Sequence, residues 1–202
     1  MNIRAWAASL PDEYYNWGGV NAYPIVPKPY IDVLKSVQGM TTPSTMHLLN
    51  LAVRHLAPNE CYLEVGTWRG ATLIGALLGN EARGYAIDND TMDDHDGDDE
   101  RSQVVWGRNI KRFGMTSRTF YIDADVPAIF ERNDPFDITA GRPIGVYLFD
   151  GDKSTEAAAY AGLAGVIPFL ADEALIFVDD ANEITIRLAV NRLERSFPDQ
   201  VV

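Results

Sequence analysis

The sequence predicts an α/β protein built on a doubly wound parallel sheet. The first observation is a set of five short apolar segments, at residues 62–65, 84–87, 119–122, 144–149 and 174–178. The second is the chain between them, which is long enough for the helical crossovers that parallel strands require. The third is that the last two segments are apolar throughout, as strands buried on both faces are. Right-handed crossovers then place helices on both sides of the sheet.

Helix signals fill the spaces between these segments. Thr42 is a suitable N-cap before Pro43, and an apolar stripe follows at helical spacing, consisting of Met46, Leu49, Val53 and Leu56. His47 is expected at the surface or at a pocket rim. The acidic segment 91–100 lacks the spacing of a calcium-binding EF-hand, so we interpret it as a solvated loop. Further helices are predicted at residues 71–78, around Trp106 and Ile110, at 155–170 and at 183–197.

Length and composition indicate one domain without a membrane or nucleic-acid partner. An irregular aromatic arm or lid is expected at residues 1–40, before a domain at residues 41–202. The net charge of −12 argues against nucleic-acid binding, and the single cysteine, Cys61, fits a reducing compartment. The N-terminus lacks the apolar core of a signal peptide, and the longest uncharged run, 157–171, is shorter than the ~20 residues of a spanning helix. We therefore expect a cytoplasmic protein, with a homo-oligomer left open.

The turn after the first apolar segment is the candidate ligand cradle. In the run CYLEVGTWRGATL (61–73), Glu64 lies near a strand end, Gly66 and Gly70 form a turn, and a helix begins at Ala71. Glycines let a ligand approach the backbone, and the helix start offers unpaired N–H groups. A dinucleotide turn needs a glycine where Trp68 stands, so this turn suits a ligand without a pyrophosphate. The pattern E-x-G-x-x-x-G resembles motif I of class I S-adenosylmethionine (SAM) methyltransferases. The alternative is a strand–helix turn that contains two glycines by chance.

Residues at the ends of the next segments extend the predicted cofactor site. Asp88 follows the turn by about 20 residues, which is the spacing at which an acid accepts the ribose hydroxyls of a nucleoside. Asp123 or Ala124, after the third segment, is expected beside the adenine. The complete set of predicted cofactor-binding residues is Glu64, Gly66, Thr67, Gly70, Asp88, Asp123, Ala124 and Asp150.

Two acidic motifs carry a more specific resemblance. The run VYLFDGDKSTEAAAYAGLAGVIPFLADEALIFVDDAN (146–182) resembles the metal-dependent sugar O-methyltransferases of the macrocin type, and more distantly the catechol O-methyltransferase group. In the macrocin-type family, a D-G-D after strand four and a D-D after strand five belong to the active site. By this resemblance Asp150, Asp179 and Asp180 are metal ligands and Asp152 is the general base. Lys153 is the alternative base.

Electrostatics supports a cation at these strand ends. Neighbouring carboxylates repel one another, and a divalent cation with all-oxygen ligands, Mg²⁺ or another such ion, relieves the repulsion. The alternative is that Asp152 and Asp180 only cap the helices that follow them.

The resemblance implies a Rossmann-like class I methyltransferase with strand order 3-2-1-4-5. It implies SAM and Mg²⁺ as cofactors, and an acceptor that is a hydroxyl of a small molecule such as a natural-product sugar. Such enzymes continue with two more strands, so the C-terminal strands six and seven are expected to be missing. Two alternatives stay open: a non-catalytic SAM-binding module, and a cephalosporin-hydroxylase-like oxidoreductase. Trp68 opposes a nicotinamide cofactor, and no 2-His-1-carboxylate iron set is recognisable.

Overall fold

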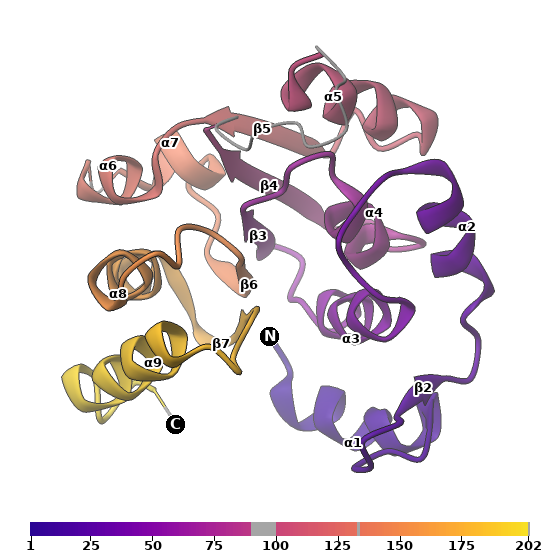
Figure 1. Ribbon diagram of the computed structural model, residues 1–202, viewed down its shortest axis with the longest axis horizontal. Helices are drawn as coiled ribbons and strands as arrows, with labels where there is room; N and C mark the ends of the chain where they lie inside the picture. Colours follow the sequence, from indigo (N-terminus) through magenta and orange to yellow (C-terminus); the bar gives the residue numbers. More distant parts are fainter. Residues whose placement is uncertain (90–99, 133, 202) are drawn as a thin grey trace.

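A five-stranded parallel sheet forms the centre of the computed structural model, which describes residues 1–89, 100–132 and 134–201 (Figure 1). The order along the sheet is β5-β4-β3-β6-β7. Its strands are β3 (Cys61–Val65), β4 (Arg83–Asp88), β5 (Thr119–Asp123), β6 (Ile144–Phe149) and β7 (Leu170–Val178). The predicted parallel, Rossmann-like α/β class is confirmed. Most of the acidic segment predicted as a solvated loop, 91–100, lies outside the described residues.

The expectation that strands six and seven are missing is wrong. Two short strands, β1 (Tyr14–Tyr15) and β2 (Tyr23–Pro24), form an antiparallel hairpin near the N-terminus. The sixth and seventh strands of the chain, β6 and β7, are present and pair in parallel, with Phe149 beside Val178. The predicted strands began at residue 62, because two-residue strands carry no periodicity that a sequence pattern can show.

Helices cover both faces of the sheet. Figure 1 shows α2, α3 and α4 gathered on one side and α6, α8 and α9 on the other. The helices are α1 (Ile3–Glu13), α2 (Lys28–Ser36), α3 (Pro43–Arg54), α4 (Ala71–Leu77), α5 (Ser102–Arg112), α6 (Val126–Glu131), α7 (Pro135–Thr139), α8 (Glu156–Gly165) and α9 (Ile184–Ser196). No helix among the described residues is long and apolar enough to cross a membrane.

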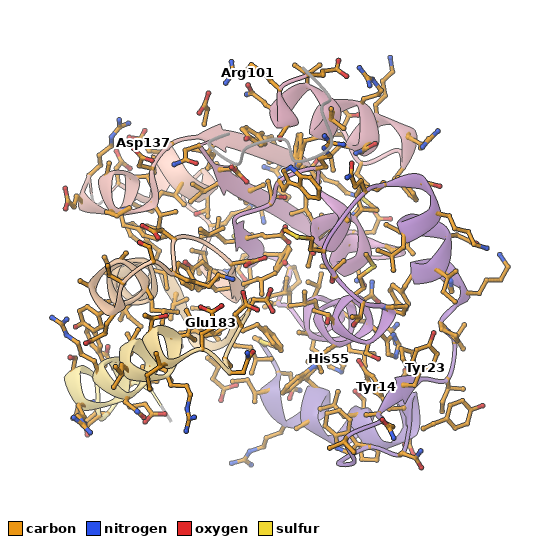
Figure 2. All side chains as sticks on the ribbon, in the orientation of Figure 1. Tyr14, Tyr23, His55, Arg101, Asp137 and Glu183 are labelled. Atoms are coloured by element: carbon orange, nitrogen blue, oxygen red, sulfur yellow. The ribbon has the colours of Figure 1, made fainter. Side chains whose placement is uncertain are left out.

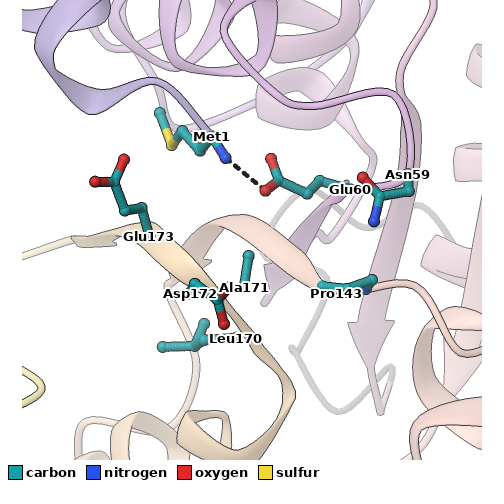
Figure 3. A pocket seen from close by; sticks show the side chains of 8 residues that line it. All are labelled: Met1, Asn59, Glu60, Pro143, Leu170, Ala171, Asp172 and Glu173. Atoms are coloured by element: carbon teal, nitrogen blue, oxygen red, sulfur yellow. Dashed lines mark hydrogen bonds and ion pairs between the residues drawn. The ribbon is translucent and has the colours of Figure 1, made fainter.

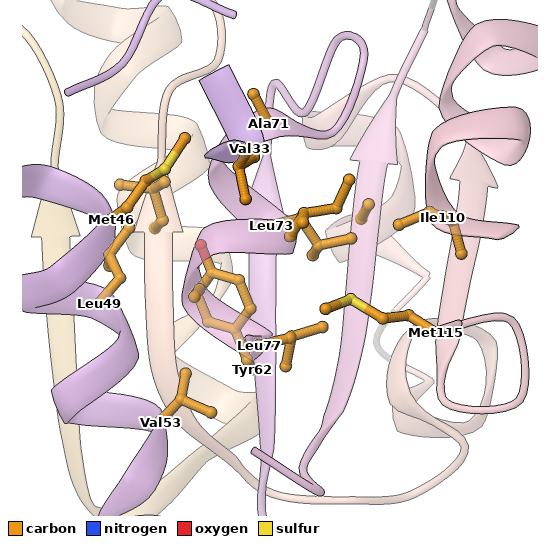
Figure 4. Packing of buried hydrophobic residues seen from close by; sticks show 14 of the residues in the cluster. Val33, Met46, Leu49, Val53, Tyr62, Ala71, Leu73, Leu77, Ile110 and Met115 are labelled. Atoms are coloured by element: carbon orange, nitrogen blue, oxygen red, sulfur yellow. The ribbon is translucent and has the colours of Figure 1, made fainter. Parts of the chain in front are cut away.

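Two large apolar clusters, one on each face of the sheet, form most of the core, because side chains alternate along every strand. Tyr62 of β3 points into the cluster with α2, α3, α4 and α5 (Figure 4). Leu63, the next residue, points into the cluster with α6, α7, α8 and α9. Both side chains are fully buried. The carboxyl edge of the sheet is thereby held between two packed layers.

Helix boundaries follow local chemistry. The predicted cap of α3 is confirmed, because the Thr42 hydroxyl oxygen accepts a hydrogen bond from the Thr45 N–H at 3.1 Å. The single helix predicted over 155–170 is instead α8 followed by a 3₁₀ turn at Ile167–Phe169. Pro168 lacks the N–H that a continuing helix needs, and Gly165 weakens the last turn.

The sequence suggested an irregular N-terminal segment, but in the structure this segment is regular. It forms α1, the β1–β2 hairpin and α2. Trp6 of α1 packs edge-on against Phe177 of β7, with ring centroids 5.9 Å apart. His47 is buried rather than at the surface, and its Nδ1 shares a 2.8 Å hydrogen bond with the Tyr30 hydroxyl. The segment is thus part of the packed structure.

Candidate functional site

Backbone hydrogen bonds continue beyond the strands and align their carboxyl ends. The Gly66 N–H donates to the Ile87 carbonyl at 3.0 Å, and the Asp150 N–H donates to the Val65 carbonyl at 3.0 Å. The Asp179 N–H donates to the Phe149 carbonyl, also at 3.0 Å. The glycine turn and both acidic motifs therefore meet at one edge of the sheet.

The glycine turn requires both of its glycines. Gly66 has φ of +79°, and a Cβ atom there would lie 2.1 Å from the Asp150 carbonyl oxygen. Gly70 has φ of +84°, and its Cβ would lie 2.8 Å from the Trp106 ring. The turn thus passes directly against the strand end that carries Asp150. Trp68 also has a positive φ, +45°, which is uncommon for a bulky residue.

Glu64 lies beneath this turn, in the protein interior. The residue is 1% exposed, and its carboxyl group accepts a 2.6 Å hydrogen bond from the Tyr62 hydroxyl. Burial raises the pKa of Glu64 to about 8, although the hydrogen bond with Tyr62 opposes the shift. Thr67, in the turn, is also buried. Both residues support the turn from within.

The raised pKa of Glu64 predicts a pH-dependent stability. Between pH 4.5 and about 8 the folded protein keeps a proton on Glu64 that the unfolded chain releases. The free energy of unfolding therefore falls as pH rises, with a contribution from this group of about 1.4 kcal/mol per pH unit. Glu64→Gln removes that contribution. In denaturant titrations at pH 6.5, 7.0 and 7.5, the variant is expected to gain stability relative to wild type as pH rises. Parallel pH profiles would contradict the assignment.

A cavity of about 480 Å³ opens beside the turn, at the carboxyl ends of β3, β4, β5 and β6. Four residues predicted as site residues line it, namely Gly66, Asp88, Ala124 and Asp152. Gly151, which lies within the same acidic motif as Asp152, also lines it. Other lining residues were not predicted as site residues from the sequence, among them Asn89, Asp125, Val126, Glu131, Phe149 and Ala158. The helix α6, which supplies part of this wall, has no strong helical period and was not predicted. The position of α6 beside the strand ends depends on tertiary contacts, which a local sequence pattern does not show.

Asp88 is held in place by the glycine turn. Its Oδ2 accepts a 2.7 Å hydrogen bond from the Trp68 N–H. Asp123, its register partner on β5, is half exposed and pairs with Arg101 at 3.5 Å. Arg101 lies beside α5, at the outer side of the molecule (Figure 2). Of the two alternatives for the adenine, Ala124 belongs to the cavity wall, and Asp123 is not among the lining residues.

Three carboxylates cluster at the ends of β6 and β7. Asp150, Asp179 and Asp180 each offer one oxygen, and these oxygens lie within 4.8 Å of one another. Burial raises the pKa of Asp150 to about 6, and the negative charges of Asp179 and Asp180 add to this. Three oxygen donors at such separations fit a hard divalent cation, which neutralises the repulsion.

Lys153 reaches into this carboxylate cluster. Its Nζ lies 2.5 Å from Asp150 Oδ1 and 2.6 Å from Asp180 Oδ2. Burial lowers the pKa of Lys153, but its hydrogen bonds with Asp150 and Asp180 outweigh burial, so the pKa is raised overall. The amine is therefore protonated in this arrangement and has no lone pair with which to act as a base.

Asp152 does not belong to the carboxylate cluster. Its Oδ1 accepts a 2.8 Å hydrogen bond from the Ser154 N–H, and the pKa of Asp152 is lowered chiefly by its hydrogen bonds with Ser154. The side chain is exposed and lines the cavity. It is thus an ionised carboxylate at the cavity rim.

A second cavity, of about 310 Å³, lies at the opposite, amino end of the strands (Figure 3). There the Met1 amino group pairs with Glu60 at 2.5 Å. Glu60 and Pro143 belong to the same wall, and they directly precede β3 and β6. This cavity is therefore remote from the glycine turn.

The fold and the edge site define a class of protein, the class I methyltransferases. A model of the methyltransferase domain family matches residues 63–181, more than half of the chain. The chain belongs to this family, and is a SAM-dependent class I methyltransferase. No curated protein matches the sequence. The macrocin-type subfamily stays a prediction.

Solved structures share the fold at low sequence identity. An O-methyltransferase from Bacillus cereus in complex with S-adenosylhomocysteine is 14% identical over 96% of this chain and 86% of that chain, with a TM-score of 0.58. A putative caffeoyl-CoA O-methyltransferase from Staphylococcus aureus is 12% identical over 85% and 80%, with a TM-score of 0.56. A TDP-rhamnose 3′-O-methyltransferase of calicheamicin biosynthesis is 14% identical over 82% and 70%, with a TM-score of 0.53.

Proposed function

We propose that this methyltransferase transfers the methyl group of SAM to a hydroxyl group of a small molecule, with the assistance of a divalent cation. One observation carries the proposal. The glycine turn, the 480 Å³ cavity and the carboxylate cluster share one edge of the sheet, and Gly66 touches the backbone of Asp150. A cofactor at the turn would therefore present its reactive end next to the carboxylates.

The cavity suggests how SAM is oriented. Asp88 lines the cavity, and its carboxylate would accept hydrogen bonds from the ribose hydroxyls. The adenine would lie between Ala124 and the wall formed by Phe149 and Ala158. The methionine end would then extend over Gly66 toward Asp150.

Asp150, Asp179 and Asp180 would hold the cation, as the resemblance implies. When bound there, a divalent cation lowers the pKa of a coordinated hydroxyl and orients it. Asp152, at the cavity rim, would take the hydroxyl proton after leaving the Ser154 N–H. Because the pKa of Asp152 is lowered, it is a weak base and suits only an acidified hydroxyl. Lys153 would serve as base only after losing its proton and both carboxylate contacts.

The reaction is an in-line displacement. The acceptor oxygen forms a bond with the methyl carbon as the bond from that carbon to sulfur breaks. The hydroxyl proton passes to Asp152, and the products are a methyl ether and S-adenosylhomocysteine. The residues of this chain contribute by holding the two reactants in line at the sheet edge.

Residues 1–40 are proposed as the segment that borders the acceptor side. The Tyr14 hydroxyl donates a 2.8 Å hydrogen bond to the Ser44 carbonyl, in the first turn of α3. Tyr15, Trp17 and Tyr23 of the same hairpin remain exposed and offer aromatic surface. A cytoplasmic location is also proposed, and the single buried free thiol, Cys61, supports a reducing compartment.

A matched pair of alanine substitutions tests whether the cavity is the SAM site. Ala158 lines the cavity, whereas Ala157, on the same helix, is exposed. Ala158→Leu is expected to weaken SAM binding at least tenfold, because the longer side chain fills space that the cofactor needs. Leucine is a good helix former, so both variants keep the fold. Calorimetric titration with SAM measures the affinities, and Ala157→Leu is expected to match wild type. Equal affinities for both variants would place SAM elsewhere.

A further inference from the structure

The ammonium of Lys153 lies between two of the three proposed cation ligands. Its Nζ contacts Asp150 Oδ1 at 2.5 Å and Asp180 Oδ2 at 2.6 Å, and only 16% of the side chain is exposed. The same carboxylates, together with Asp179, form the set whose oxygens lie within 4.8 Å of one another. A cation belonging to the chain itself thus occupies the space that a bound ion would share.

The charges of the carboxylate cluster point to the same competition. Lys153 offsets one of the three negative charges, so a divalent cation is attracted less strongly than it would be by three unpaired carboxylates. An ion that binds Asp150 and Asp180 meets an ammonium of the same sign on the same two groups. Two cations on shared oxygens repel, so one of them has to withdraw.

Lys153 is the partner that can move. Asp150 and Asp179 are fixed by backbone hydrogen bonds to the neighbouring strand ends, to Val65 and Phe149 respectively. The lysine side chain is a flexible four-carbon stem that carries a point charge. It can leave the carboxylates without any change in the sheet.

We propose that Lys153 is an internal competitor of the divalent cation. Its ammonium holds the carboxylates together in the cation-free protein, and it leaves Asp150 and Asp180 when the cation binds. This inference rests on the cation of the proposed function. Its consequence is a cation affinity lower than three carboxylates alone would give.

Calorimetric titration of the SAM-free protein with MnCl₂ tests the competition directly. Lys153→Met keeps an unbranched side chain of nearly the same length and removes its charge, and it is expected to lower the Kd for Mn²⁺ at least tenfold. Lys153→Gln, a polar replacement, is expected to act in the same direction. Lys28→Met is the matched control, because Lys28 pairs with Asp32 on the surface of α2, far along the chain from the carboxylate cluster. It removes the same charge and is expected to leave the Kd unchanged.

Thermal unfolding gives a second, independent readout. In EDTA the carboxylates of Lys153→Met lack their counter-charge, so its Tm is expected to fall below that of wild type. At the same Mn²⁺ concentration, the protein with the lower Kd for Mn²⁺ is stabilised more. Mn²⁺ is therefore expected to raise the Tm of Lys153→Met more than that of wild type. A merely structural role of Lys153 would lower the Tm equally in both conditions.

The outcomes separate this inference from the proposed function. Tighter Mn²⁺ binding by Lys153→Met, or binding by that variant alone, supports the competition. Equal or weaker binding by the variant, with Mn²⁺ bound by wild type, overturns the competition and leaves the proposed cation in place. No Mn²⁺ binding by either protein overturns both the competition and the cation, while SAM binding is measured separately and is unaffected.

Discussion

Asp150→Asn is expected to lower Mn²⁺ affinity at least a hundredfold while changing SAM affinity by no more than a few-fold. Asp150 is a partly buried carboxylate at the end of β6, and its partners Asp179 and Asp180 belong to the end of β7. An asparagine keeps the shape but removes one of the three negative charges that attract the cation. Calorimetric titrations with MnCl₂ and with SAM measure the two affinities separately. Methyl transfer to any hydroxyl acceptor that wild type uses is expected to fall with cation affinity.

Asp172→Asn is the control for this change. Asp172 is an exposed acid near the start of β7, at the opposite end of the strand from Asp179. Its variant carries the same change in net charge, so it is expected to bind Mn²⁺ as wild type does. Wild-type Mn²⁺ affinity in Asp150→Asn, or full methyl transfer in excess EDTA, would contradict the cation site.

Asp88→Ala is expected to weaken SAM binding at least tenfold with the fold intact. A lost hydrogen bond to a charged carboxylate costs about 1.5–3 kcal/mol, and each 1.4 kcal/mol corresponds to about tenfold in affinity. The variant also frees the Trp68 N–H, which the carboxylate now accepts at 2.7 Å. Circular dichroism confirms the fold, and calorimetry with SAM gives the affinity.

The neighbouring strand provides the comparison. Asp123 is the register partner of Asp88 on β5, but its carboxylate pairs with Arg101 at the surface. Asp123→Ala is therefore expected to bind SAM with an affinity close to that of wild type. If Asp123→Ala weakened binding and Asp88→Ala did not, the ribose would have to lie on the β5 side.

The parts of the site that the sequence could predict are those tied to strand ends. Parallel strands put their carboxyl ends at one edge, so the order of Gly66, Asp88, Asp150 and Asp179 along the chain was enough to bring them together. Continuous apolar runs predicted β6 and β7. β6 runs over the expected residues, 144–149, and is buried throughout, whereas β7 lies at the edge of the sheet and is only partly buried, contrary to the expectation. Glycine spacing and acid spacing were both local signals.

The parts that the sequence could not predict depend on contacts between distant segments. His47 has polar neighbours on an amphipathic helix, yet it is buried because Tyr30 and Tyr14 from the N-terminal segment cover it. Similarly, the wall that α6 contributes to the cavity has no sequence period of its own. Lys153 was considered only as a base, since nothing in D-G-D-K shows that the side chain turns back toward Asp150 and reaches Asp180.

Calorimetric titration of SAM into the wild-type protein, with and without Mg²⁺, tests the central claim most directly. The central claim is that this edge of the sheet is a SAM site beside a cation site. We expect saturable binding of one SAM per chain in both conditions, because the cofactor cavity is complete without the cation. The absence of saturable binding by the folded protein at millimolar SAM would contradict the account.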